Sequence, residues 1–146
     1  MKRLLLLTLF ALLCTKASAQ SFTLDEISGL LNHPDIAVYL TSKGFTVCKD
    51  CYGEGNPVIY TKNKGAANPE WVNCNEHSFD YFTVDLKLGQ ALLDEAKNKF
   101  ALEKTGHEDA LNDDRYSFTF YRFSNGIVKL QFLVFKQQVE INVFAN

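Results

Sequence analysis

Three cysteines and one histidine form the pattern with the greatest chemical content in this sequence. Cys48 and Cys51 make a Cys-x2-Cys pair, and Cys74 and His77 make a Cys-x2-His pair after 22 intervening residues. Three thiolates and one imidazole can complete the tetrahedral shell of a structural zinc ion. Zinc is therefore one interpretation of these four residues, and the sequence implies no other cofactor.

A disulfide is the preferred interpretation of the same cysteines, because the N-terminus predicts export and exported chains meet an oxidising compartment. We expect Cys74 to be bonded to Cys48 or to Cys51, closing a loop that stabilises the fold by roughly 3 to 4 kcal/mol. A bond between Cys48 and Cys51, or free thiols, are the remaining alternatives. Every disulfide scheme leaves one of these three thiols over.

Thiol-disulfide catalysis by the Cys48 and Cys51 pair is the weakest interpretation. Such enzymes place the pair at the N-terminus of a helix, where the helix dipole lowers the pKa of the first thiol. Gly53, Gly55 and Pro57 follow the pair here, so we expect no helix to start at the pair. Catalysis would require Cys48 to be partly exposed with a lowered pKa.

The other polar groups have a simpler interpretation. His33, His77 and His107 stand in no recognised catalytic or metal-binding spacing, and the run from Glu108 to Asp114 lacks the glycine-centred loop of an EF-hand. We therefore expect solvated side chains at these positions.

Four apolar residues are candidates for a binding patch. Trp71 stands in a polar stretch, and Tyr121, Phe123 and Ile127 flank a predicted hairpin turn. Clustered aromatic side chains within a polar rim are typical of binding surfaces. The alternative is that these residues form a second core covered by the N-terminal helices.

Residues 1–19 have the features of a secretory signal peptide: a cationic start, an apolar run and the small residues Ala17-Ser18-Ala19 before a cleavage site. The apolar run is too short to span a membrane, and the bulky Leu13 before Cys14 argues against lipid attachment. Removing this segment lowers Lys plus Arg from 15 to 12 against 17 acids, a net charge of −5. A chain of this charge is a poor partner for nucleic acid.

The stretch 115–146 predicts an antiparallel sheet, because it is dense in β-branched and aromatic residues. A three-residue turn with Gly126 at positive φ would pair Phe120 with Leu130 and Phe118 with Phe132, all facing the core. A third strand is predicted over 139–145, after a tight turn at 136–138.

The preceding chain predicts helices and strands that pack on this sheet. Thr23 and Glu26 form a capping box that opens a short helix, and a second helix ends at Gly44. The longest helix begins at Gly89 or Gln90 and stops at 104–106. Strands are expected at 45–47, 58–60 and 79–88, with long loops at 62–78 and 107–114.

These elements predict a single α+β domain over residues 20–146, an antiparallel sheet with N-terminal helices and one longer middle helix packed on it. Residues 24–88 and 89–146 each give helix followed by three strands, which suggests an internal duplication of structure. We expect a secreted or periplasmic, non-catalytic domain that binds a protein or peptide, with inhibitors as members of the class. The alternative functions are a carrier of small apolar ligands and, less favoured, a thiol-disulfide enzyme.

Overall fold

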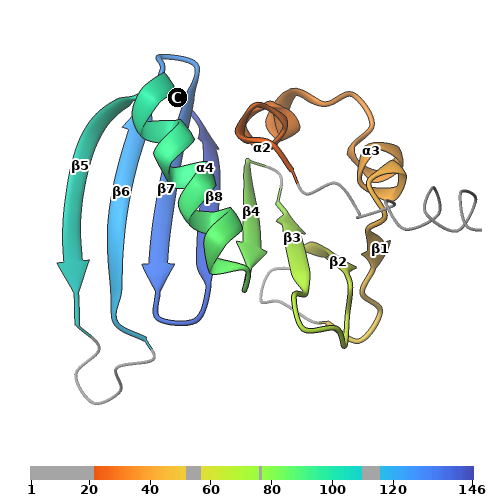
Figure 1. The fold of residues 1–146 in the computed structure, drawn as a ribbon. Helices are drawn as coiled ribbons and strands as arrows, with labels where there is room; N and C mark the ends of the chain where they lie inside the picture. Colours follow the sequence, from red (N-terminus) through yellow and green to blue (C-terminus); the bar gives the residue numbers. More distant parts are fainter. Residues whose placement is uncertain (1–21, 52–56, 76, 110–115) are drawn as a thin grey trace, which may run out of the picture.

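The computed structural model describes residues 22–51, 57–75, 77–109 and 116–146 (Figure 1). The predicted signal peptide therefore lies outside the described residues. Within them, no helix is long and apolar enough to cross a membrane. The helices are α2 (Leu24–Gly29), η1 (Leu30–Asn32), α3 (Ile36–Ser42) and α4 (Leu86–Lys99). The strands are β1 (Thr46–Val47), β2 (Val58–Lys62), β3 (Glu70–Cys74), β4 (Ser78–Thr83), β5 (Ala101–Glu108), β6 (Phe118–Ser124), β7 (Val128–Phe135) and β8 (Val139–Ala145).

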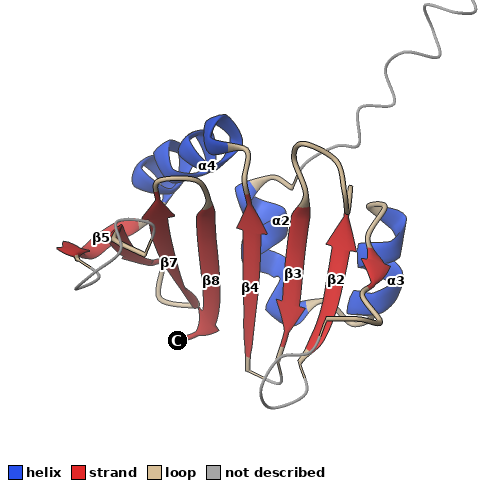
Figure 2. Cartoon of the chain, turned by 90° about the horizontal axis from the view of Figure 1, so that it is seen from below, coloured by secondary structure: helices blue, strands red, loops and turns tan. Residues whose placement is uncertain are grey.

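All the described strands form one antiparallel sheet of eight, in the order β1-β2-β3-β4-β8-β7-β6-β5. The short N-terminal helices and the longer α4 pack on it, as the predicted α+β class requires (Figures 1 and 2). Helices followed by four strands occur twice along the chain, and the last strands of the two halves, β4 and β8, pair at the centre. The predicted duplication is thus present in the topology, with four strands instead of three in each half.

In each half, one strand lies where the sequence predicted no strand. β3 falls within the predicted loop 62–78, where its neighbours are glycine, asparagine and proline. β5 occupies the predicted end of the long helix and the start of the predicted acidic loop. It is an edge strand of mostly exposed residues, among them the charged Glu103, Lys104 and Glu108. Exposed charges of this kind protect a sheet edge, and they explain why no apolar pattern marks the strand.

Side-chain caps fix the helices. Thr23 and Glu26 form the predicted capping box of α2, and Gly44, which follows the C-cap Lys43 of α3, has a positive φ of +86°. Asp85 caps α4, accepting hydrogen bonds from the amides of Lys87 and Leu88. α4 therefore begins and ends several residues earlier than predicted, because the cap and not the apolar periodicity sets its start.

The β6–β7 hairpin differs from the predicted register. Phe118 pairs with Phe135 and Phe120 with Leu133, so neither faces the core partners expected of it. The side chain of Asn125 accepts hydrogen bonds from the amides of residues 127 and 128, which shortens the turn. Aromatic residues on both faces of β6 made the apolar pattern ambiguous. The predicted positive φ of Gly126 is confirmed at +86°.

The hydrophobic core lies between the helices and one face of the sheet. The alternation of apolar residues in the sequence correctly indicates which side chains of β7 and β8 face this core. They are the even-numbered residues of β7 and the odd-numbered residues of β8. α4 lies close to β8, since a Cβ at Gly89 would be 2.5 Å from a methyl carbon of Val139. The buried core residues of the sheet are Tyr60, Val72, Phe79, Tyr81, Phe123, Leu130, Phe132, Val139, Ile141 and Val143.

One charged cluster lies within this core. The Tyr81 hydroxyl donates a 2.5 Å hydrogen bond to Glu70 Oε2, and the ammonium of Lys62 lies 4.0 Å from Glu70 Oε1. Lys62 is 3% exposed and Glu70 5% exposed, so removal of either partner would leave a charge buried without its partner. Burial and the neighbouring Glu70 raise the pKa of Tyr81. The cluster is best understood as a structural ion pair.

Candidate binding surface

The face of the sheet opposite the helices, here called the open face, is the main candidate surface. The buried apolar residues of all four described helices belong to the core on the other face. In Figure 2, α2 lies behind β4 and β3, on the far side of the sheet from the viewer. Strand side chains alternate between faces, so residues paired with an open-face residue also lie on the open face.

The first feature of the open face is a line of mainly apolar residues across six neighbouring strands, here called the aromatic row. Trp71, Phe82 and Leu133 are partly exposed in it, and Phe120 is buried. From β3 across to β5, the paired residues of the aromatic row are Trp71, Phe82, Glu140, Leu133, Phe120 and Gly106.

The second feature is a line of polar residues beside the first, here called the polar row. Each strand contributes one residue to each row, and the two residues are two positions apart in the sequence. Both lie on the open face because alternate residues of a strand share a face. From β3 across to β5, the paired residues of the polar row are Asn73, Asp80, Asn142, Gln131, Arg122 and Lys104.

Two carboxyl groups lie at the centre of the open face, Asp80 on β4 and Glu140 on β8. Burial raises the pKa of Asp80, although a hydrogen bond with Asn73 opposes this shift. Burial also raises the pKa of Glu140, and the charge of Asp80 adds to the effect, against a hydrogen bond with Asn142. The ionised forms of both groups are therefore disfavoured, which makes this part of the face a place where a cationic group would be stabilising.

Cations gather at the other end of the polar row. Arg122 Nε donates a hydrogen bond of 3.1 Å to Gln131 Oε1. The guanidinium of Arg122 and the ammonium of Lys104 lie 5.4 and 5.7 Å from the centre of the Phe120 ring. Such cation–π contacts hold the two charges beside the aromatic row. A pocket of about 270 Å³ opens here, lined by Glu103, Arg122, Phe123, Lys129, Leu130, Gln131 and Phe144.

The structure does not bring the four predicted binding residues together. Trp71 lies on β3 in the open face, whereas Tyr121 and Phe123 point to the opposite, helix-covered face. Phe123 is fully buried in the main hydrophobic core, so the prediction that it is exposed is wrong. Ile127 is 70% exposed in the β6–β7 turn. Binding roles for Trp71 and Ile127 remain predictions.

Sequence reasoning missed most of the open face. Phe82, Phe118 and Phe120 were assigned to the core or left without a role, and Asp80 and Glu140 were not considered. The available signal was the alternation of aromatic residues on both faces of β6, which implies apolar side chains on a face without helices. The rows themselves depend on pairings between distant strands, which the sequence does not reveal.

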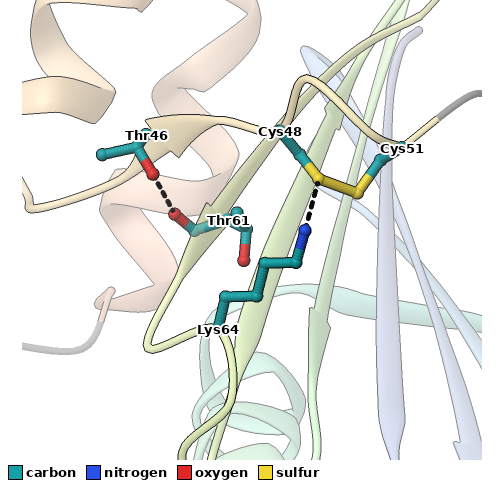
Figure 3. The surroundings of a disulfide bond; sticks show 5 residues. All are labelled: Thr46, Cys48, Cys51, Thr61 and Lys64. Atoms are coloured by element: carbon teal, nitrogen blue, oxygen red, sulfur yellow. Dashed lines mark hydrogen bonds between the residues drawn. A yellow bond between two sulfur atoms is a disulfide. The ribbon is translucent and has the colours of Figure 1, made fainter.

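The cysteines pair differently from the preferred prediction. Cys48 is bonded to Cys51, and Cys74 on β3 is free (Figure 3). The bond from Cys74 was therefore predicted wrongly, and the alternative bond within the Cys-x2-Cys pair is the one formed. Cys74 packs against the hydrophobic core, and burial, with the charge of Asp80, raises its pKa to about 12.

The same geometry bears on zinc and on thiol catalysis. Cys48 and Cys51, bonded to each other, cannot act as thiolate ligands, and the described residues contain no group of three or more side chains able to hold a metal. Cys48 is only 7% exposed, although the ammonium of Lys64 lies 3.5 Å from its sulfur (Figure 3). This burial does not meet the requirement for a reactive first thiol.

One further group resembles catalytic machinery. His107 lies between the hydroxyl of Thr119, at 3.1 Å from Nδ1, and a carboxylate oxygen of Asp109, at 2.9 Å from Nε2. Hydroxyl, imidazole and carboxylate in series can activate a nucleophile when the site excludes water. The side chains of His107 and Asp109 are 55% and 81% exposed, so water is not excluded from this group.

The carrier alternative would require an enclosed apolar cavity. The pocket beside Arg122 is lined by charged and amide groups as well as by Phe123, Leu130 and Phe144, and a second pocket of about 190 Å³ is lined by Tyr116, Phe135, Gln137 and Gln138. Both open to solvent at the surface of the sheet, and neither resembles the apolar interior that a lipid-like ligand needs. No family model, curated protein or solved structure matches the chain.

Proposed function

We propose that this chain is an exported, non-catalytic binding domain that acts through protein–protein contacts made by its open face. The observation that carries the proposal is the aromatic row beside the polar row on a sheet face that none of the described helices covers. Aromatic side chains next to arginine and other polar groups are the composition of binding interfaces. The Cys48–Cys51 bond supports export, because such bonds persist in oxidising compartments.

The fold suits this role better than it suits catalysis or ligand transport. Helices and core hold one face of the sheet, so the other face is a rigid platform that needs little reordering on binding. Trp71 and Phe82 are partly exposed and adjacent across β3 and β4, which makes them the expected centre of the contact.

Site-specific photo-crosslinking tests the proposal. A photoreactive phenylalanine analogue replaces Phe82 on the open face in one sample and the exposed Gln90 of α4 in a matched control. After irradiation in the envelope fraction of the source cells, we expect a discrete protein adduct from position 82 and none from position 90. The same adduct from both positions, or none from position 82, would count against the open face as the binding surface.

A further inference from the structure

The polar row of the open face is complementary to itself when its order is reversed. Its midpoint falls between the amides Asn142 on β8 and Gln131 on β7. At equal distances from this midpoint stand Asp80 on one side and Arg122 on the other. The outermost positions are Asn73 and Lys104. If the row faces a reversed copy of itself, each side chain therefore lies opposite a group that it can bind. The amides of Asn142 and Gln131 face each other, Asp80 faces Arg122, and Asn73 faces Lys104.

The aromatic row is matched about the same midpoint at its two outer pairs of positions, whereas its innermost pair, Glu140 on β8 and Leu133 on β7, sets a carboxyl group against an aliphatic side chain. Phe82 on β4 and Phe120 on β6 are at equal distances from it, and so are Trp71 on β3 and Gly106 on β5. Gly106 has no side chain because a Cβ there would lie 2.7 Å from atoms of the Phe120 ring. The ring of Phe120 therefore covers Gly106, and Trp71 of a second copy would lie against this ring.

We infer that the open face binds a second copy of this chain, with Asp80 of each copy against Arg122 of the other. This inference rests on the proposed function, and it identifies the protein partner of the open face as a second copy of the chain. In such a dimer the two sheets face each other, and a two-fold axis runs between them, parallel to the strands and level with the gap between β8 and β7. This axis places each position of a row opposite the position at the same distance on the other side of the midpoint. Twisted sheets of the same hand pack face to face in this way, about 10 Å apart, and a two-fold interface requires such self-complementarity.

The acid and the base cannot satisfy each other within one chain. β8 and β7 separate β4 from β6, so Asp80 and Arg122 lie about 14 Å apart at the usual strand spacing. Face-to-face pairing brings the two charges together and removes the aromatic row from water. The cations at one end of the polar row are thereby matched with the acidic residue at the other end in a second copy.

Charge reversal tests the inference through the oligomeric state. In sedimentation velocity, we expect the exported chain to have twice the mass of a single chain. Asp80→Arg places two arginines together, and Arg122→Asp places two aspartates together. Because a two-fold dimer contains each contact twice, each variant should weaken dimerisation by about 100-fold. Lys87→Glu on α4 is the control and should leave the dimer unchanged.

The two variants together make the test specific. Mixing the Asp80→Arg chain with the Arg122→Asp chain should give a heterodimer, since every contact again joins opposite charges.

If Asp80→Arg does not fold, as judged by circular dichroism, the exposed Arg122→Asp chain carries the test, because it must be monomeric. A wild-type chain that stays monomeric, or a dimer that survives Arg122→Asp, overturns the inference. Adducts from position 82 with a different protein would then preserve the proposed function, whereas the loss of all adducts would remove both.

Discussion

At the scale of single residues, the notable groups are the two carboxyls at the centre of the open face. Asp80 and Glu140 are partly buried with raised pKa values, and an acid of this kind destabilises the fold when it is ionised. Their hydrogen-bond partners in the sheet, Asn73 and Asn142, are neutral amides. The free chain therefore carries an electrostatic cost in the middle of its sheet, which a cationic partner group would remove.

This cost predicts a pH dependence with a definite sign. A carboxyl whose pKa is higher in the folded state than in the unfolded state binds more protons when folded, so stability falls as pH rises from the unfolded pKa through the folded one. We expect Glu140→Gln to increase the free energy of unfolding at neutral pH and to reduce this fall. Urea unfolding of the chain in dilute solution between pH 4 and pH 8 measures both effects.

The control for this measurement is Glu108→Gln on the exposed edge strand β5, which should change neither quantity. A Glu140→Gln chain that is less stable than the wild type at neutral pH would contradict the assignment, because it would show that the carboxylate is stabilising in the free chain.

At the scale of elements, the hairpin of β6 and β7 decides which aromatic residues hold the fold together. Phe123 is fully buried against Phe132, with an edge-to-face ring contact at 5.8 Å, whereas Phe118 lies on the open face beside Phe135. Phe123→Ala should cost about 3 to 5 kcal/mol of unfolding free energy, as for a core cavity. Phe118→Ala should cost less than about 2 kcal/mol, because its ring is only partly buried.

Chemical denaturation of the two variants side by side measures this difference. The register predicted from sequence gives the opposite order, since it buries Phe118 and leaves Phe123 near the surface. Equal costs would mean that both faces of the hairpin are equally covered, which the open face described above does not allow.

The elements also show what the sequence can predict. Helix caps and apolar periodicity are local, so α2, α3, β7 and β8 were predicted from them. β5 was not predicted, because an exposed edge strand has no apolar face that would appear as a pattern in the sequence. The open face could not be predicted at all, since its rows join β3, β4, β8, β7, β6 and β5, and strand pairing over such distances leaves no local signal.

At the scale of the whole molecule, the cysteines connect the sheet to global stability. The Cys48–Cys51 bond closes a loop of only a few residues, so by loop entropy it contributes about 2 kcal/mol, less than a bond from Cys74 would. Cys74 is instead a free thiol that packs against the core shared by both halves of the chain. Its reactivity is therefore a measure of whether the sheet is intact.

The last prediction concerns this thiol. With a pKa raised to about 12, Cys74 is ionised to about one part in 10,000 at pH 8, and only the thiolate reacts with an alkylating reagent. We expect residues 20–146 in the native state to be alkylated far more slowly than a free thiol, and the same residues unfolded in urea without reductant to gain one label, at Cys74. Mass spectrometry of peptides locates the label, and Cys48 and Cys51 remain unlabelled because they are bonded to each other. Rapid labelling of the native chain at Cys74 would contradict its packing. If labelling follows the unfolding transition, the strand that sequence analysis took for a loop belongs to the cooperative core of the molecule.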